Sequence, residues 1–542
     1  MDWLDIISVD DAETRGEPLY QQIVRSLKES IANGKLPVDS KLPTNRELAA
    51  LLKVDRSTVS RAYLELSEEG LIVSHVGRGT FVRSPKTSDS ASRAKSATQS
   101  ASTLLPSRAR PIVWAEKFSR ASDTVESILS RQPTSTGLSV DAISFGGGIP
   151  TEEFYPSDQF QRIVAKMVSS GAVQEMFEYS PAEGNSELRD EVLAYLSRQG
   201  IKATADELLI VSGSQQGIDL VSNALIDEGD VVLLEEPSYF WAICNFRARQ
   251  ARLIGIPVDE EGMRVDVLEN VLNRQKAKML YVMPAFQNPT GSTLSAERRE
   301  KLLEIVREHQ VPVLEDNFVG ELIYDGQRLP PLRAHEGAQD IVIHQGTFSK
   351  ALCPGLRLGW LVAPAEVMSR LRAAKRSSDL STNSMAQVIL AHYLKDGLYA
   401  RHLEHVRSAY RARLETMIRA LNEYVAPLSV VPSESSGAMR VSWTVPQGGL
   451  FVWVKLPERL SARELLAFAE RQGVTFSPGD LFFVNSDRPE FLRLCFIQNS
   501  EEFIEEGIKR LGRAVEAYFA SVSRMRHAER IPSRRRSEGV LI

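Results

Sequence analysis

Short apolar runs alternate with helical stretches from residue 207 onward. Runs of this length without polar alternation are typical of β-strands that are buried on both faces of a sheet. We therefore expect a mostly parallel α/β sheet whose functional groups lie in the loops that leave the strands. The runs are Leu208–Val211, Val231–Leu234, Leu253–Ile256, Met279–Val282, Val311–Leu314, Ile341–Ile343 and Leu358–Val362.

The N-terminal part shows a helical pattern instead. Apolar residues recur at four-residue steps from Leu19 to Ile31, which predicts an amphipathic helix. The capping box Thr44–Glu47 predicts the start of a second helix, because its hydroxyl and carboxylate satisfy two free backbone amides. The tight turn Val54–Ser57 predicts a third helix, which ends at Gly70.

A predicted hairpin follows the third helix. The apolar segments Leu71–His75 and Thr80–Val82 flank the glycine-rich tip Gly77–Gly79. Two helices joined by a short turn and followed by a hairpin form a winged helix-turn-helix, whose recognition helix can enter the major groove of DNA. The helices alone are equally consistent with a small protein-interaction module.

Residues 84–110 are mostly Ser, Ala, Thr and Arg and have almost no large apolar residue. Such a segment cannot bury enough surface to offset the entropy of ordering. We expect a winged helix-turn-helix domain at 15–83, a flexible linker at 84–139, a large body at 140–520 and an Arg-rich tail at 521–542. The tail is interpreted as a solvated segment, with a DNA-touching arm as the alternative.

Composition excludes several protein classes. The 542 residues are 43% hydrophobic and 25% charged, which argues against a disordered, collagen-like or fibrous chain. The three Cys residues are far apart, so they form no disulfide framework and have no metal-ligand spacing, as expected for a reducing cytoplasm. We find no secretory signal pattern and no apolar run of about 18 residues, so we expect neither secretion nor membrane spanning.

Charge is distributed unevenly along the chain. The whole chain has a formal net charge of -5, with 65 basic and 70 acidic residues. Residues 15–83 contain eleven Lys or Arg and eight Asp or Glu, a net charge of about +3. This modest excess is consistent with attraction to phosphates but is not diagnostic of it.

The predicted strand ends carry residues with a shared chemistry. Ser212–Gly217 opens a helix with small side chains and free amides, where an anion can bind, and Asn288–Gly291 forms a rigid turn. Asp316 ends a buried strand, where a protonated ring nitrogen can be its partner. Lys350 supplies an amine and Arg357 a further phosphate ligand. An amine beside a bound dianion and a carboxylate that faces a pyridinium are the requirements of pyridoxal 5'-phosphate (PLP).

Four motifs of the N-terminal unit closely resemble the DNA-binding domain of GntR-family regulators. They are Pro18–Ile23, Lys41–Ala49, Arg56–Tyr63 and Gly77–Val82, which together cover nearly the whole unit. The residues that this resemblance implies as DNA-contacting are Arg46, Arg56, Ser57, Thr58, Arg61 and Gly79.

The body resembles class I/II aminotransferases of PLP fold type I over residues 140–520. That resemblance implies a large domain with a mostly parallel sheet and a smaller α+β C-terminal domain. Together with the N-terminal unit, the chain resembles MocR/GabR-type regulators of the GntR family.

The aminotransferase resemblance implies roles for individual residues around PLP. Lys350 would form the internal aldimine, Asp316 would pair with the pyridine nitrogen, Asn288 would bond the ring hydroxyl and Tyr239 would stack on the ring. The residues implied to hold the phosphate are Ser214, Gln215, Thr347, Ser349 and Arg357.

The same resemblance implies an effector site and a second subunit. Arg493 would bind the α-carboxylate of an amino acid, as a fork-shaped guanidinium does best, and the loop with Gly146, Gly147 and Gly148 would close over it. Tyr179 would reach the phosphate of the neighbouring subunit, so we expect a homodimer.

One departure from the family pattern concerns the positions after Asp316. The family usually has a Tyr two or three residues beyond this Asp, but this chain has Phe318 and Val319. The missing hydroxyl should change the acidity of the cofactor complex and slow proton transfer, which favours a sensor over an efficient catalyst.

We therefore expect a transcriptional regulator that binds operator DNA and senses an amino acid, a related amine or PLP. Two alternatives remain open from the sequence. In one, the body is a working aminotransferase and the N-terminal unit is accessory; in the other, the body only dimerises the DNA-binding arms. No residue selects the effector, the operator, or activation over repression.

Overall fold

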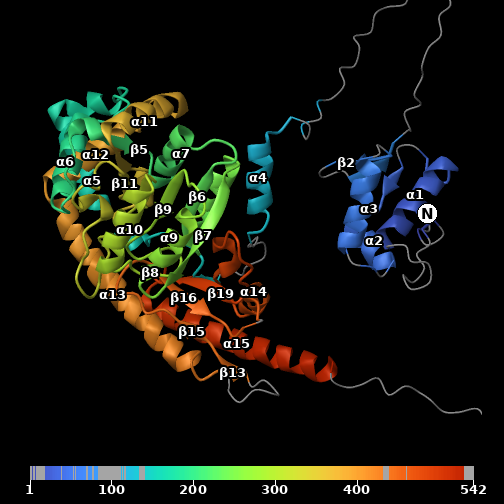
Figure 1. Cartoon of the computed structure of the whole chain (residues 1–542). Helices are drawn as coiled ribbons and strands as arrows, with labels where there is room; N and C mark the ends of the chain where they lie inside the picture. Colours follow the sequence, from blue (N-terminus) through green and yellow to red (C-terminus); the bar gives the residue numbers. More distant parts are fainter. Residues whose placement is uncertain are drawn as a thin grey trace, which may run out of the picture. The chain divides into compact units, whose positions relative to one another are not determined.

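The structure, a computed structural model, consists of two compact units, Met1–Arg110 and Pro111–Ile542 (Figure 1). Each unit is described by itself. The described residues are 3, 6–7, 19–37, 40–52, 54, 56–68, 71–75, 79–83, 112, 114, 117–132, 141–430, 439–458 and 460–529.

The first unit contains a helical core and a three-stranded antiparallel sheet with the order β1-β3-β2. The predicted capping box is present, since Thr44 N donates to Glu47 Oε2 at 2.8 Å. Ile23, Val59 and Leu66 have no exposed surface and form the core. The winged helix-turn-helix prediction is thereby confirmed. The elements are α1 (Leu19–Ala32), β1 (Lys41–Leu42), α2 (Asn45–Leu52), α3 (Arg56–Glu68), β2 (Ile72–His75) and β3 (Gly79–Val82).

Some N-terminal predictions concern residues that the structure does not describe. Pro18, Gly70, Gly77 and Arg78 are among them, and so is most of the predicted linker, from 84 to 111. The end of the predicted tail, residues 530–542, also lies outside the described part of the chain.

An eight-stranded sheet forms the centre of the second unit, in the order β5-β12-β11-β10-β9-β6-β7-β8 (Figure 1). Its five central strands from β11 to β7 are parallel, whereas β12 is antiparallel to both neighbours and β8 is antiparallel to β7. All seven predicted strands are present, so the prediction of a mostly parallel sheet is confirmed. The strands are β5 (Leu208–Val211), β6 (Val231–Glu236), β7 (Arg252–Asp259), β8 (Gly262–Met263), β9 (Met279–Val282), β10 (Val313–Asp316), β11 (Val342–Thr347) and β12 (Gly359–Val362).

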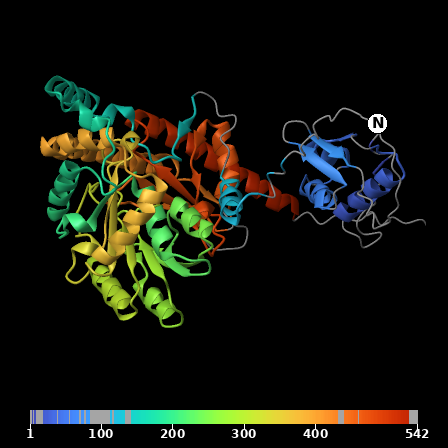
Figure 2. The same cartoon turned by 90° about the horizontal axis from the view of Figure 1, so that it is seen from above.

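Helices cover both faces of this sheet (Figure 2). On β6, Val232 and Leu234 pack with one set of helices and Leu233 with the other, because successive side chains of a strand point to opposite faces. Burial on both faces explains why the strands are apolar runs. One set is α7 (Ser214–Leu225), α8 (Phe240–Ala248) and α11 (Ala365–Ser378); the other is α9 (Val265–Leu272) and α10 (Ala296–Glu308).

A smaller α+β domain follows the large sheet, as predicted. Its sheet has the order β15-β16-β19-β18, and β4 (Ile143–Ser144) pairs in parallel with β17 (Val474–Thr475). The start of the body and its C-terminal part therefore fold together. The strands are β13 (Ser429–Val430), β14 (Met439–Arg440), β15 (Ser442–Trp443), β16 (Phe451–Lys455), β18 (Ser477–Pro478) and β19 (Phe491–Cys495). Its helices are α14 (Ala462–Arg471) and α15 (Glu501–Glu529), and α13 (Leu398–Tyr424) packs along α15. The helices α5 (Ser157–Ser170) and α6 (Ser186–Ser197) both pack against α12 (Ser384–Lys395), and α6 contacts β5 of the large sheet.

Two helices extend into segments predicted as linker and tail. Within 84–139, helix α4 (Arg120–Leu129) packs against α8, and its Ile128 is buried. Helix α15 continues to Glu529, and Val522 is buried. In both segments a few apolar residues at helical spacing pack against the rest of the second unit. Composition alone does not predict this packing.

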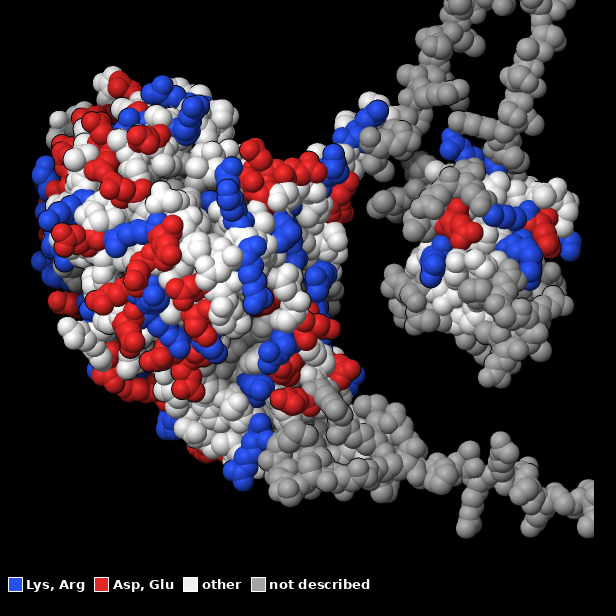
Figure 3. Space-filling model, viewed as in Figure 1, with Lys and Arg blue, Asp and Glu red and all other residues white. Residues whose placement is uncertain are grey.

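The surface of the second unit is mixed in charge. On the face shown in Figure 3, Lys and Arg side chains are interspersed with Asp and Glu. No helix among the described residues is both long and apolar enough to cross a membrane.

Replacing Gly346 with Ala should destabilise the second unit. A Cβ at Gly346 on β11 would overlap the indole of Trp360, which is itself buried against Phe348 and Tyr195. Overpacking of this kind costs about 1 to 3 kcal/mol, so we expect a lower melting temperature in calorimetry. Gly355→Ala is the matched control, because nothing lies within 4 Å of its Cβ position. Equal melting temperatures for the two variants would contradict the prediction.

Candidate functional site

A pocket of about 350 Å³ lies where the loops that follow the central strands meet the smaller domain. It is lined by residues from β10, the start of α7 and α8, the segment after β11, and β16 and β19. The predicted residues that line it are Gly147, Gly148, Ser214, Gln215, Tyr239, Asn288, Asp316, Thr347, Ser349, Lys350, Arg357 and Arg493.

Lys350 projects its amine into this pocket from the loop after β11. Its Nζ donates a hydrogen bond to the carbonyl oxygen of Gly148 at 2.7 Å. Burial, with the charges of Arg493 and Arg357 adding to it, lowers the pKa of the Lys350 amine. A buried lysine with a lowered pKa is a better nucleophile than a surface lysine, because more of it is neutral.

Asp316 ends β10 and is fully enclosed. Its Oδ2 accepts a hydrogen bond from the Tyr281 hydroxyl at 2.7 Å, while its Oδ1 is buried without a hydrogen-bond partner. Burial raises the pKa of the Asp316 carboxyl to about 6. A buried acceptor without a donor is costly, so this atom fits a ligand that brings an N–H group, such as a protonated pyridine nitrogen.

Arg493 on β19 is a buried cation without an acidic partner among the described residues. Its Nη1 donates to Asn288 Oδ1 and its Nη2 to the carbonyl oxygen of Gly146, both at 2.8 Å. Its guanidinium lies between the rings of Phe451 and Phe482, at 4.1 and 4.9 Å from their centroids. Burial lowers the pKa of Arg493 to about 10. A buried guanidinium that contacts only neutral groups fits a carboxylate ligand.

The start of α7 forms an anion site with Arg357. Gly213 has φ +84°, and a Cβ there would lie 2.6 Å from Arg357 Nη2, so the close approach of this guanidinium requires glycine. Thr347 and Ser349 add hydroxyls, with Thr347 Oγ1 donating to Ser349 Oγ at 3.0 Å. Free amides at a helix start, hydroxyls and a guanidinium together suit a phosphate dianion.

A buried ion pair supports the anion site from behind. Lys375 Nζ donates to Asp379 Oδ1 at 2.9 Å, and Asp379 Oδ2 accepts from Ser212 Oγ and Gln216 Nε2 at 3.0 and 2.7 Å. These contacts fix the backbone that leads into Ser214. The sequence analysis missed this network, as well as Tyr281, because a lysine in a helix and a tyrosine in an apolar strand are ordinary core positions.

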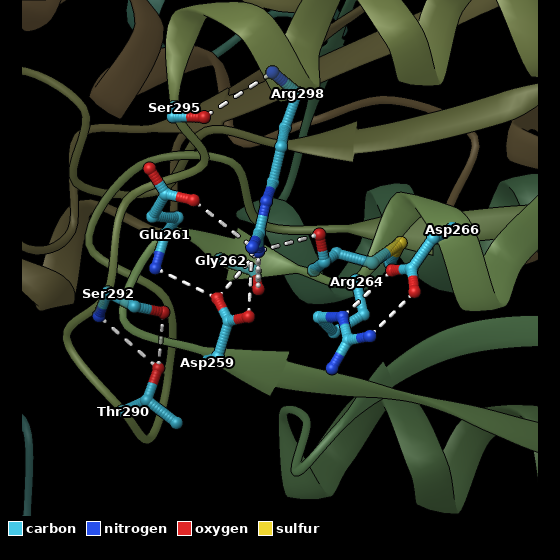
Figure 4. Close-up of polar contacts among 10 residues, drawn as sticks. Asp259, Glu261, Gly262, Arg264, Asp266, Thr290, Ser292, Ser295 and Arg298 are labelled. Atoms are coloured by element: carbon cyan, nitrogen blue, oxygen red, sulfur yellow. Dashed lines mark hydrogen bonds and ion pairs between the residues drawn. The ribbon is translucent and has the colours of Figure 1, made fainter.

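The start of α10, which follows the loop that carries Asn288, is held by a polar clamp on Arg298 (Figure 4). Arg298 donates to both carboxylate oxygens of Asp259, at 2.6 and 2.9 Å, and to the carbonyl oxygen of Gly262 at 2.9 Å. Glu261 lies 3.2 Å from the same guanidinium. The clamp ties the β7–β8 hairpin to the start of α10, directly after the Asn288 loop.

Three residues named in the sequence analysis either lie outside the pocket or differ from the family pattern. Tyr179 is 86% exposed and does not line the pocket of its own chain. Phe318 lines the pocket and Val319 is buried, so neither position supplies a hydroxyl.

The predicted DNA-contacting residues lie on α2, α3 and β3 of the first unit. Arg61 is exposed on α3, and its guanidinium lies 4.1 Å from the centroid of the Tyr20 ring. Thr58 is partly buried on the same helix, and Gly79 begins β3. Arg46 lies on α2, and Arg56 and Ser57 begin α3; their side chains are outside the described part of the chain.

Comparisons with known proteins match both units. The family model of class I and II aminotransferases matches residues 151–511, and that of the gntR family of bacterial regulatory proteins matches 19–82. The 2-aminoadipate transaminase of Thermus thermophilus is 38% identical over 76% of this chain and 100% of its own. The uncharacterized HTH-type transcriptional regulator YdfD of Bacillus subtilis is 30% identical over 91% of this chain and 96% of its own. The crystal structure of the α-aminoadipate aminotransferase LysN from Thermus thermophilus, at 36% identity, covers 76% of this chain and 100% of LysN with a TM-score of 0.67.

In the cofactor-free protein, Asp316→Asn should change how stability depends on pH. The pKa of Asp316 is about 6 in the folded state against 3.8 for an ordinary aspartate, so the folded state keeps a proton that the unfolded state loses. Wild-type stability therefore falls as pH rises from about 4 to about 6, by an amount on the order of 3 kcal/mol. The Asn variant lacks this loss of stability. In urea unfolding, its free energy of unfolding relative to that of wild type should therefore be higher at about pH 7.5 than at about pH 4.5. Asp325→Asn, at an exposed position, is the control, and parallel pH profiles for Asp316→Asn and wild type would contradict the prediction.

Proposed function

Because the chain belongs to the class I and II aminotransferase family and carries an N-terminal domain of the gntR family, we propose that it is a PLP-dependent transcriptional regulator of the MocR type. The aminotransferase-like unit has PLP as its cofactor, as the family and its solved structures imply. In this proposal the unit senses an amino acid, a related amine or PLP itself, and the first unit binds operator DNA. The proposal includes a cytoplasmic location, since the regulator needs access to its operator DNA.

One observation supports the sensing role above all. Among the described residues, the pocket holds two buried groups without a complementary partner: Asp316 Oδ1 accepts no hydrogen bond, and the Arg493 guanidinium bonds only neutral groups and has an unpaired Nε. The Lys350 amine lines the same pocket. Buried polar groups in folded proteins are normally satisfied, so this pocket is built for a ring cation and a carboxylate.

When bound, PLP supplies an aldehyde that condenses with primary amines and a pyridinium ring that withdraws electrons. We assign Lys350 as the amine that anchors it and Asp316 Oδ1 as the acceptor that keeps the ring nitrogen protonated. Asn288 uses Oδ1 as an acceptor for Arg493, which leaves its Nδ2 group to donate to the ring hydroxyl. Tyr239 stacks on the ring, and Arg493 binds the α-carboxylate of the ligand. The phosphate is assigned to Ser214, Gln215, Thr347, Ser349 and Arg357.

A second copy of the chain completes the proposed site. Tyr179 is exposed beside Phe177, which is 73% exposed, and Ser180 Oγ donates to Ser384 Oγ at 2.9 Å. Met385, which follows Ser384 in the chain, is exposed, and so is Leu380. An apolar patch of this kind suits a symmetric interface, from which Tyr179 would reach the phosphate of the neighbouring subunit.

Ligand binding regulates DNA binding only if the two states of the protein differ in their affinity for the ligand. A homodimer presents two winged helices, so the arrangement of half-sites on the operator follows from the symmetry of the dimer. The dimer then has two states. In one state the two winged helices match the spacing of the half-sites, and in the other they do not; the ligand shifts the population of the dimer toward one of them.

A working aminotransferase remains the second candidate, because the 38% identity to a transaminase extends over the whole of that enzyme. The pocket of one chain is lined by all the residues assigned to PLP except Tyr179. Phe318 and Val319 favour the regulator, since no hydroxyl at these positions assists proton transfer at the ring oxygen. Stoichiometric release of a keto acid at enzyme-like rates would favour the aminotransferase instead.

Lys350→Ala should separate the two functions of the chain. We expect the purified variant to lose the visible absorption band of the attached cofactor, because Lys350 is the assigned anchoring amine. It should still bind DNA, and added amino acids should no longer change its DNA affinity. Absorption spectra and mobility shifts measure both effects, with the exposed Lys166→Ala as the control. A normal ligand response by Lys350→Ala would contradict the sensing role.

Arg61→Ala should weaken operator binding. Arg61 is exposed on the proposed recognition helix, and the loss of one specific arginine contact costs about 1 to 3 kcal/mol, which is about fivefold to 150-fold in affinity. The probe is a duplex that the wild-type protein selects from a random-sequence pool, titrated by fluorescence anisotropy. Lys35→Ala, at an exposed position after α1, is the control. Unchanged affinity of Arg61→Ala would exclude this face as the DNA-reading surface.

A further inference from the structure

The charged residues that line the pocket are all accounted for by the proposed cofactor and by an α-carboxylate. They are Asp316, Lys350, Arg357 and Arg493. Every other described lining residue is uncharged. The part of the pocket that remains for the side chain of a bound amino acid therefore offers no ionic partner.

Aromatic rings form one wall of this remaining space. Phe240 and Trp241 follow Tyr239 at the start of α8, and their rings contact each other edge to face at 5.2 Å. Phe482 belongs to the same wall, and its ring lies edge-on to Trp453 at 5.8 Å. Phe240 and Phe482 are almost completely buried and form the fixed part of the wall, whereas Trp241 is 41% exposed.

The outer edge of the space is aliphatic with one amide. Ile149 and Leu481 line it, together with Gln132, which follows helix α4. Ile128 of α4 packs into the same cluster as Phe240 and Phe482. The cation next to Gln132 in the chain, Arg131, is exposed and does not line the pocket.

These surroundings discriminate between side chains. A carboxylate or ammonium placed against this wall would lose its hydration without gaining an opposite charge, which is strongly unfavourable. An apolar side chain placed there gains burial of its own surface and of the rings. The amide of Gln132 tolerates a polar but uncharged end.

We infer that the ligand of this pocket is an α-amino acid with an uncharged, mainly apolar side chain of branched aliphatic or aromatic type. The inference rests on the proposed function, since it assumes that the pocket receives an amino acid at bound PLP. It adds the class of ligand, which the cofactor and carboxylate contacts leave open.

The test titrates the full-length protein carrying PLP with five amino acids: L-phenylalanine, L-leucine, L-alanine, L-glutamate and L-lysine. The readouts are the shift of the cofactor absorption band and the rise in melting temperature. We expect L-phenylalanine or L-leucine to bind about tenfold or more tightly than L-alanine, because the larger side chain is buried. L-Glutamate and L-lysine should bind no better than L-alanine.

Two variants test the wall itself. Trp241→Ala should lower the ratio of L-phenylalanine to L-alanine affinity, whereas Trp114→Ala, at an exposed tryptophan outside the pocket, should leave it unchanged. Leu481→Arg places a cation at the edge and should shift preference toward L-glutamate by about tenfold. Val445→Arg, at an exposed apolar position outside the pocket, is its control. The ratios compare ligands on one protein, so a general loss of folding cannot imitate the effect.

The outcomes distinguish this inference from the function on which it rests. If L-glutamate or L-lysine shifts the band of the wild-type protein at lower concentration than L-leucine and L-phenylalanine, the inference is overturned and amino-acid sensing stands. If none of the five amino acids changes the band or the melting temperature, the inference and amino-acid sensing are both overturned, and a related amine or PLP itself is left as the sensed ligand.

Discussion

A buried guanidinium without an acidic partner among the described residues is the constraint around which the pocket of the second unit is arranged. Arg493 lies on β19 of the smaller domain and contacts Asn288 of the large domain and Gly146 near the start of the body. Because a buried cation is costly, these neutral acceptors and two flanking rings are needed to retain it before any ligand arrives. The contacts that stabilise Arg493 therefore also fix the large and the smaller domain of the second unit relative to each other. They fix the position of the loop with Gly146 as well.

The chain segment that leads from the DNA-binding unit enters the second unit beside this pocket. Helix α4 packs on α8, and its Ile128 contacts the aromatic cluster that contains Phe240 and Phe482. Gln132, just after α4, lines the pocket itself. The same aromatic cluster therefore borders the ligand space through Phe240 and Phe482 and helix α4 through Ile128.

The sequence was sufficient for the strands, the two domain types and most of the pocket, because buried parallel strands and strand-end motifs are local patterns. It was insufficient where a partner comes from a distant segment. Tyr281 is an ordinary strand residue until it faces Asp316, and Lys375 is an ordinary helical lysine until it donates to Asp379 and Gln216. Helix α4 was assigned to a linker because its apolar residues are few and become meaningful only against α8. The assigned roles of the pocket residues and of Arg61 stay predictions.

The energetics of the pocket favour the binding of a complementary ligand. In the ligand-free protein, burial of the Asp316 carboxyl and of the Arg493 guanidinium costs free energy. Binding of a ligand with complementary groups is therefore favourable and releases free energy. In a regulator that free energy can shift a conformational equilibrium, provided that the complex persists. Turnover would consume the complex. Turnover also requires proton transfers, which a hydroxyl near the ring oxygen would assist. With Phe318 and Val319 in place of that hydroxyl, the chain retains the binding groups and lacks one that serves mainly the chemistry.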